Sequence, residues 1–215
     1  EWIKTRWYAA VGLVVSLALS VYTCINAVSM LHDLGGAFFY STLLTGNIAL
    51  MTQLKYLPLA IALLIGLPQF LPEITNKRIR LTLHLPVGNR TLVAGMALYG
   101  LLLITLFNAI VLALFCYKNS VLFPTEVTVP VRETLLGWFL AAYWVYNFIA
   151  FTALEPNRMR QLFYALTGIV VLSLYLYHVP FHGAYSTSMP VLALMALLSC
   201  PLVLFSGYRL NKGER

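Results

Sequence analysis

Apolar residues fall in six long runs, separated by shorter stretches of polar and charged residues. Each run has about 20 residues, the length a helix needs to cross about 30 Å of hydrocarbon while satisfying its own backbone hydrogen bonds. We therefore predict six membrane-spanning helices in a single transmembrane domain over residues 1–215. The predicted spans are Trp7–Leu31, Leu54–Leu71, Thr91–Tyr117, Thr134–Leu154, Gln161–Tyr177 and Met189–Tyr208.

The composition of the chain agrees with this pattern. Of its 215 residues, 60% are hydrophobic and only 10% are charged, and the mean hydropathy is +0.83. A soluble domain of this size cannot bury so much apolar surface. The predicted fold class is an all-α integral membrane protein.

The basic residues predict which side of the membrane each loop occupies. If both termini are cytoplasmic, the inner side carries eleven lysines and arginines and the outer side three, as the positive-inside tendency requires. The inner residues are Lys4, Arg6, Lys77, Arg78, Arg80, Arg90, Arg158, Arg160, Arg209, Lys212 and Arg215, and the outer ones are Lys55, Lys118 and Arg132. A cationic rim facing anionic lipid also explains the net charge of +7 without a nucleic-acid partner.

The segment at 34–53 is apolar enough to be considered as a seventh span. A further crossing there would move the basic stretch at 72–90 to the outside while the N-terminal end stays inside, against the positive-inside tendency. We therefore expect this segment to be re-entrant or interfacial, or to extend the second helix outward.

The basic stretch at 72–90 lies between the second and third spans. Apolar and polar residues alternate from Arg78 to Leu85, a pattern that on its own favours a strand. A lone strand between two membrane helices has no pairing partner, whereas a short interfacial helix buries its leucines at the membrane edge and extends its arginines to water. We predict a short basic helix on the cytoplasmic face, ended by Pro86.

This arrangement resembles ABC-2 type permeases, the membrane subunits of a class of ABC exporters. In that family an acidic residue closes the second span, and a motif with basic residues around a Leu-Pro step follows. Glu73 and the stretch RIRLTLHLPVGNRTLV correspond to these features, and Leu85-Pro86-Val87 is the closest piece. The basic, aromatic start EWIKTRWY and the six-span pattern extend the resemblance over nearly the whole chain.

The resemblance implies that the cytoplasmic link is a coupling helix that docks on a separate ABC ATPase subunit. ATP and Mg would bind in that ATPase, so this chain would bind no cofactor and would not itself be an enzyme. The partners implied are the ATPase, a second permease, identical or related, and membrane lipid, in a multi-pass protein of the bacterial inner membrane. The coupling residues would be Glu73, Lys77, Arg78, Arg80, Leu81, Leu85, Pro86 and Arg90.

Three asparagines, Asn26, Asn108 and Asn147, fall within or near predicted spans. Polar side chains in hydrocarbon face a neighbouring helix or a cavity, so these residues either bond helices together or line a translocation path. His178 and His182 are four apart, but Pro180 between them breaks the helix that would align them. We therefore predict no metal site.

Two other functions fit the same composition. One is a non-transport membrane subunit that anchors or organises a larger assembly through the basic stretch. The other is an intramembrane enzyme, which is disfavoured because Asp33 is the only aspartate and a metal-binding aspartate cluster is absent from the sequence. Co-purification with an ATPase separates the permease from both.

The predicted orientation can be tested by labelling cysteines in intact cells. After replacement of the native cysteines, Asn89→Cys should be shielded from an impermeant thiol reagent, and Ser120→Cys should react, because the charge distribution places them on opposite sides. Labelling of Asn89→Cys without lysis would reverse the orientation and remove the basis for ATPase docking.

Overall fold

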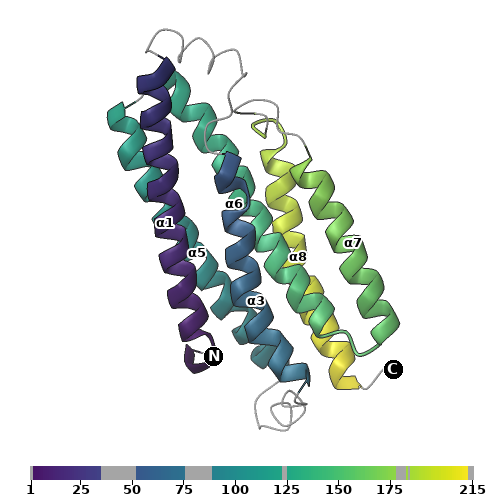
Figure 1. Ribbon diagram of the computed structural model, residues 1–215. Helices are drawn as coiled ribbons and strands as arrows, with labels where there is room; N and C mark the ends of the chain where they lie inside the picture. Colours follow the sequence, from purple (N-terminus) through teal and green to yellow (C-terminus); the bar gives the residue numbers. More distant parts are fainter. Residues whose placement is uncertain are drawn as a thin grey trace.

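The computed structural model describes residues 2–34, 52–75, 89–122, 125–177, 183 and 185–212. These residues form six α-helices and one 3-10 turn and contain no strand (Figure 1). The all-helical prediction is therefore confirmed. The elements are α1 (Trp2–Leu34), η1 (Thr52–Lys55), α3 (Leu57–Thr75), α5 (Asn89–Leu122), α6 (Thr125–Ala153), α7 (Arg158–Leu176) and α8 (Met189–Lys212).

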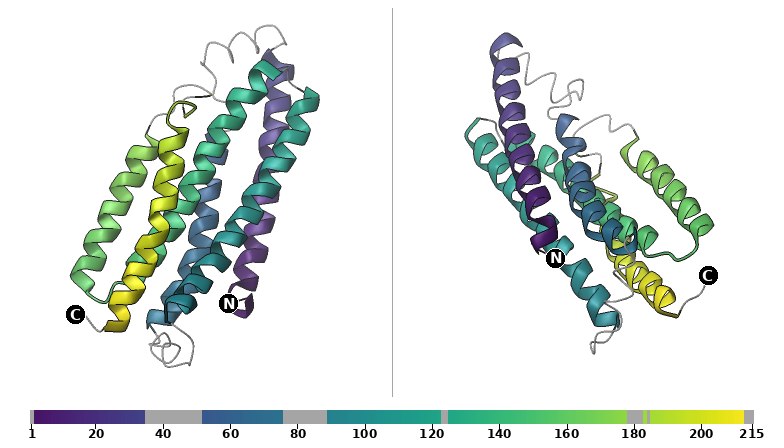
Figure 2. Two further views of the ribbon diagram at one scale, coloured as in Figure 1. Left: turned by 180° about the vertical axis from the view of Figure 1, so that it is seen from behind. Right: turned by 60° about the horizontal axis from the view of Figure 1, so that its bottom comes forward.

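The helices run alternately up and down and lie side by side (Figures 1 and 2). Helix α1 begins and α8 ends at the same end of the bundle, which we call the basal end; the opposite end is the apical end. Helix α3 also ends, and α5 begins, at the basal end. The predicted coupling segment therefore connects two basal helix ends in the sequence.

The lengths and surfaces of the helices are compatible with a multi-pass membrane protein. Five helices are long and apolar enough to cross a bilayer, and the apolar part of α3, Leu57–Pro72, is shorter. Large apolar side chains such as Leu106 and Ile169 point outward, as they would toward lipid. The five long apolar segments are Thr5–Met30, Thr91–Tyr117, Thr128–Ala153, Arg158–Leu176 and Met189–Arg209.

Several helices extend beyond the apolar runs that predicted them. Most of the outer loop expected at 118–133 is helical, because α5 continues to Leu122 and α6 begins at Thr125 rather than at Thr134. Hydropathy marks only the part of a helix suited to hydrocarbon, and the backbone hydrogen bonds can continue past it. The acidic Glu126 in the first turn of α6 favours this early start, since it complements the positive end of the helix dipole.

Hydrogen bonds between buried side chains join α3, α5 and α6 near the basal end. Tyr146 on α6 is fully buried and donates its hydroxyl to Gln69 Oε1 on α3 at 2.8 Å. Gln69 Nε2 in turn donates to the carbonyl oxygen of Met96 on α5 at 2.7 Å. In an apolar surrounding an unpaired amide is costly, so this network favours one relative placement of the three helices.

Gly100 allows α5 to approach α6 at this network. A Cβ atom at this position would lie 2.0 Å from the Tyr146 hydroxyl oxygen and 2.3 Å from its Cζ. The phenol ring cannot retreat without breaking its hydrogen bond to Gln69. The close packing of α5 against α6 therefore depends on glycine, which has no side chain, at position 100.

Substitution of this glycine tests the packing. Gly100→Ala should lower the free energy of unfolding by about 1–3 kcal/mol, because the methyl group overpacks the contact with Tyr146. Gly95→Ala is a matched control on the same helix, since a Cβ there meets nothing within 4 Å. The control should be neutral, or more stable by up to about 1 kcal/mol from helix propensity. Equal stability of the two variants in a denaturant titration would contradict the close approach.

Candidate functional site

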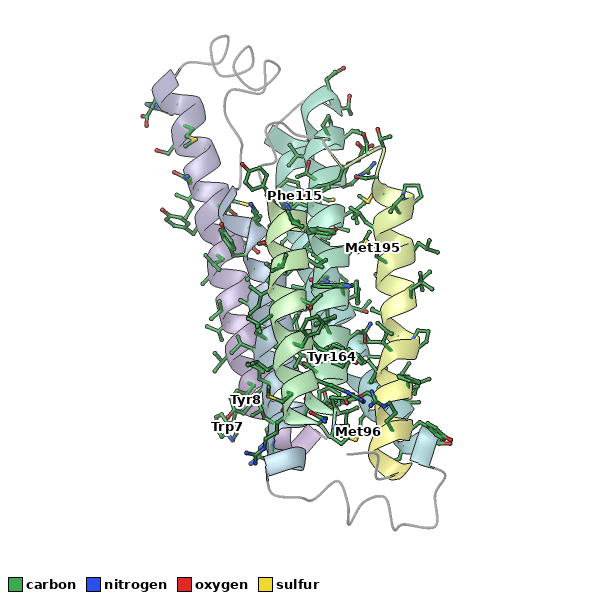
Figure 3. The ribbon with its side chains drawn as sticks, turned by 90° about the vertical axis from the view of Figure 1, so that its right-hand side faces the viewer. Trp7, Tyr8, Met96, Phe115, Tyr164 and Met195 are labelled. Atoms are coloured by element: carbon green, nitrogen blue, oxygen red, sulfur yellow. The ribbon has the colours of Figure 1, made fainter. Side chains whose placement is uncertain are left out.

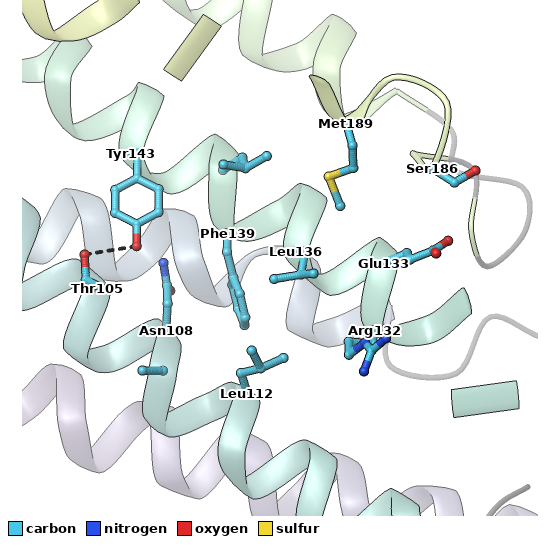
Figure 4. A pocket seen from close by; sticks show the side chains of 12 residues that line it. Thr105, Asn108, Leu112, Arg132, Glu133, Leu136, Phe139, Tyr143, Ser186 and Met189 are labelled. Atoms are coloured by element: carbon cyan, nitrogen blue, oxygen red, sulfur yellow. Dashed lines mark hydrogen bonds between the residues drawn. The ribbon is translucent and has the colours of Figure 1, made fainter. Parts of the chain in front are cut away.

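A groove runs along the apical half of the bundle between α5 and α6, and the residues leading into α8 lie at its mouth (Figure 4). We call it the apical groove, and its volume is about 590 Å³. Its wall is mostly apolar, with polar residues at two levels. The lining residues are Thr105, Asn108, Ala109, Leu112, Arg132, Glu133, Leu136, Phe139, Leu140, Tyr143, Ser186 and Met189.

The deeper polar level lies near the middle of the spans. Thr105 and Asn108 are three residues apart and share one face of α5, and Tyr143 faces them from α6 (Figure 4). The Tyr143 hydroxyl donates to Thr105 Oγ1 at 3.0 Å, and Thr105 donates to the carbonyl oxygen of Leu101 at 2.7 Å. The hydroxyl hydrogens of Thr105 and Tyr143 are therefore both used in hydrogen bonds within the protein.

Asn108 differs from these neighbours because its side chain has no partner. The residue is only 4% exposed, yet neither Nδ2 nor Oδ1 makes a hydrogen bond to any described residue. Exchanging the nitrogen and oxygen positions does not change this, since both atoms are unpaired. Buried amides are normally hydrogen-bonded, and an exception calls for a functional explanation. Asn108 therefore lines the apical groove with an unpaired carboxamide whose two polar atoms are covered by neighbouring side chains.

The second polar level forms the apical mouth. Arg132 and Ser186 are exposed there and Glu133 is half-buried. The turn that carries Ser186 is held by Gly183, whose φ of 86° favours glycine and whose backbone N–H donates to Thr134 Oγ1 at 2.8 Å. The mouth thus offers one positive and one negative charge side by side.

Tyr185 fastens the same turn to α6. Its ring packs on Gly137, where a Cβ atom would lie 2.7 Å away, and its hydroxyl donates to the carbonyl oxygen of Tyr175 at 3.0 Å. Burial raises the pKa of the Tyr185 phenol above its usual range, so the hydroxyl remains a donor at neutral pH. Tyr175 in turn donates to the Gly137 carbonyl oxygen at 2.6 Å. These bonds fix the position of the mouth relative to α6.

Below the groove, three polar contacts join α6 to α8. We call this set the basal seam, and its members on α6 and at its end are four residues apart, so they share one face. The contacts are Asn147 Nδ2 to Ser199 Oγ at 2.8 Å, Ser206 Oγ to the Phe151 carbonyl oxygen at 3.1 Å, and Arg209 Nη1 to Glu155 Oε2 at 3.1 Å. The α6–α8 contact is therefore bonded in the basal half, where the groove does not extend.

The ion pair at the end of the seam is almost completely buried. The Glu155 side chain is 0% exposed and that of Arg209 is 10% exposed. Glu155 Oε1 has no hydrogen-bond partner among the described residues. Such a pair carries a large desolvation cost, and removal of one partner leaves an uncompensated buried charge.

The three predicted path residues have different surroundings. Asn108 lines the apical groove, whereas Asn147 lies in the basal seam and donates to Ser199. Asn26 is half-buried on α1 and lines neither the apical groove nor the second groove described below. Of the three, only Asn108 lies at a described cavity.

The predicted coupling residues fall mostly beyond the described part of the chain. Glu73 lies in the last turn of α3 and Arg90 in the first turn of α5. The other six, Lys77, Arg78, Arg80, Leu81, Leu85 and Pro86, lie outside the described residues.

The groove also contains residues that our sequence reading missed. Thr105 and Tyr143 at the deeper level and the adjacent Arg132 and Glu133 at the mouth were not among its candidates. A signal for Thr105 was present, because it stands three residues from Asn108 and so on the same helical face. No comparable signal in the sequence predicts which residues of α6 lie across the groove from Thr105 and Asn108.

A second groove, which we call the lateral groove, lies between α3, α6 and α7 and has a volume of about 560 Å³. Its wall is apolar except near the basal end, where Arg158 and Gln161 line it. Near the apical end, Lys55 donates a hydrogen bond to the carbonyl oxygen of Leu176 on α7. Within the described ranges, no group of three or more His, Cys, Asp or Glu residues could hold a metal ion.

The basal seam predicts a strong dependence on Arg209. Arg209→Met should lower the free energy of unfolding by about 3–5 kcal/mol, because Glu155 then remains buried without a countercharge. Arg160→Met is the control, since Arg160 is exposed and its loss should change stability by less than about 0.5 kcal/mol. A double variant, Glu155→Leu with Arg209→Met, should recover most of the loss. If Arg209→Met and Arg160→Met caused equally small losses in the free energy of unfolding, the ion pair would not stabilise the seam.

Comparisons with known proteins leave the function to be inferred from this geometry. No protein-family model, curated protein sequence or solved structure matches the chain. The resemblance to ABC-2 permeases therefore rests on the residues around Leu85-Pro86-Val87, the basic, aromatic start and the pattern of apolar helices.

Proposed function

We propose that this protein is the permease subunit of an ATP-driven ABC exporter. It would form part of the translocation path in the cell membrane, with its basal end in the cytoplasm and six crossings, α3 being the shortest. The single observation that carries this proposal is the apical groove, whose wall contains a buried, unpaired Asn108 inside an apolar bundle. A polar side chain inside an apolar bundle carries a desolvation cost, so its presence there favours a role in binding or passing a molecule.

The different packing of α6 in the two halves of the bundle supports a path rather than a static pocket. In the apical half the groove lies between α5 and α6, and in the basal half the seam bonds α6 to α8. A protein that exports its cargo alternates between access from each side. The described arrangement fits the state in which the apical side is accessible, and separation of the seam would open the other side.

The hydrogen bonds of Gln69 offer a route for transmitting motion. The predicted coupling segment connects α3 with α5, and Gln69 ties these two helices together through Met96. Tyr146 on α6 belongs to the same network, so a displacement of α3 and α5 relative to α6 would break its bond to Gln69. That displacement would also move the wall of the groove that carries Asn108. This is the rigid-body movement that a docked ATPase would drive.

The remaining requirements of an exporter would be met by partners. A cytoplasmic ABC ATPase would hold ATP and Mg, and a second permease, identical or related, would complete the path. The apolar walls of the groove favour hydrophobic or amphipathic cargo taken from membrane lipid or moved through it.

Charge reversal in the coupling segment tests the proposal. Arg78→Glu with Arg80→Glu should release the ATPase or uncouple its hydrolysis from transport, because attraction at a docked surface becomes repulsion. Loss of a desolvated charge pair costs about 2–5 kcal/mol, which is about a 30-fold or greater loss of affinity. Co-purification of the ATPase and cargo-stimulated ATP hydrolysis are the measurements.

The matched control replaces both arginines by glutamine. This neutral change should weaken docking less and leave the orientation to the remaining basal charges. If the reversed variant inserts correctly, holds its ATPase and couples normally, the segment is an ordinary cytoplasmic loop. If no ATPase co-purifies with the native protein, a membrane anchor or scaffold becomes the better interpretation.

A further inference from the structure

We propose that the apical groove binds an apolar molecule with a single amide group, and that Asn108 recognises this amide through both of its polar atoms. The inference rests on the proposed function in one respect, since it takes the occupant to be the exported cargo or a close mimic of it. Binding itself requires neither the ATPase nor transport.

The chemistry of Asn108 defines the group that it can bind. Its Nδ2 is a donor and its Oδ1 an acceptor, and both lack a partner among the described residues. Both atoms are covered in the unoccupied bundle, so an occupant pairs with them when the side chain turns into the groove. A primary amide presents a carbonyl oxygen and an N–H on the same side, so it can pair with both atoms at once. An ester or ether offers only acceptors and would leave Oδ1 unpaired.

The neighbours of Asn108 do not compete as donors to the ligand. Tyr143 donates to Thr105, and Thr105 donates to the carbonyl oxygen of Leu101. The hydroxyl hydrogens at the deeper polar level are therefore already used, although the oxygens remain acceptors. Of these three residues, only Asn108 can donate to the amide carbonyl and accept from its N–H at once.

The apolar wall between the two polar levels favours an occupant with a single amide group over one with several amide groups. From Tyr143 to Arg132, α6 rises by about 16 Å, at about 1.5 Å for each residue. The side chains that line this interval include Leu112, Leu136 and Leu140, which cannot hydrogen-bond. A peptide laid along it would leave its other amides unpaired, whereas a hydrocarbon chain would not. The occupant that fits best is a long-chain amide, with its amide at Asn108 and its chain directed toward the mouth.

Three probes of equal chain length test this inference on the purified full-length protein in phosphatidylcholine nanodiscs. Dodecanamide carries a donor and an acceptor, methyl dodecanoate only acceptors, and dodecane neither. Competition against radiolabelled dodecanamide should rank them in that order. The ester still accepts from Nδ2, so the amide gains one hydrogen bond over it, and one such bond in a membrane predicts about a 3-fold preference for the amide, and about 18-fold at most.

Asn108→Leu should reduce the preference for dodecanamide over methyl dodecanoate to within about 2-fold, because leucine keeps the bulk and removes both polar atoms. Asn147→Leu is the matched control: the same substitution on a buried asparagine whose amide is bonded to Ser199 outside the groove. This control should retain the preference. The comparison of probes on the unmodified protein keeps the test decisive if a variant fails to fold.

Three results would overturn the inference: equal affinities of the three probes for the unmodified protein, a preference that survives Asn108→Leu, or tighter binding of acetyl-trileucinamide than of dodecanamide. The last result would identify an apolar peptide as the occupant. None of them affects ATPase docking, so failure of this inference is distinguishable from failure of the proposed function.

Discussion

A bundle with an apolar outer surface has to satisfy its internal polar groups with its own atoms, and this constraint organises the structure around α6. Tyr146 turns toward Gln69 on α3, and Asn147, the next residue, turns toward Ser199 on α8. Helix α6 thus bonds to different neighbours through adjacent residues. Since lipid offers no hydrogen bonds, these contacts have no competing partner outside the protein, and they select one packing among many that are equally apolar.

The two halves of the bundle use polar groups in opposite ways. In the basal half the polar side chains of α6 and α8 meet one another, ending in the pair of Glu155 and Arg209. In the apical half, Asn108 reaches a groove instead of a partner (Figure 4). The side view of the molecule shows Phe115 and Met195 toward the apical end and Tyr164 and Met96 toward the basal end (Figure 3). Helix α6 is therefore bonded to α8 in the basal half and borders a groove in the apical half.

Hydropathy predicted the helical class and the approximate centres of the spans, because the length and apolar character of a membrane helix are properties of a single segment. It could not predict that α6 begins at Thr125, since helical hydrogen bonding continues into polar sequence. Nor could it separate Asn108 from Asn147. Both look alike along the chain, and the difference depends on whether Ser199 or a groove lies opposite.

The inward face of a membrane helix is also hard to predict for a physical reason. Lipid and protein interior are both apolar, so the hydrophobic pattern of α5 does not mark which side carries Gly100 against Tyr146. The pairing of Glu155 with Arg209 depends on two segments 54 residues apart, and sequence spacing carries no information on it. The role that we propose for the basic stretch likewise depends on a surface of another molecule, which the sequence of this chain does not contain.

Helix α7 packs mainly against α6 along its length. At its basal end Asn157 caps the helix by accepting from the N–H groups of Met159 and Arg160, and at the apical end Lys55 donates to the carbonyl oxygen of Leu176. With 19 residues, α7 is the shortest of the five long apolar segments and measures about 28 Å, close to the thickness of the hydrocarbon layer. A helix of this length spans a bilayer of average thickness only when nearly upright, and in a thinner bilayer it would tilt. Because the lateral groove lies between α7 and α3, such a tilt would change the width of the groove, so we expect its shape to depend on the thickness of the surrounding membrane.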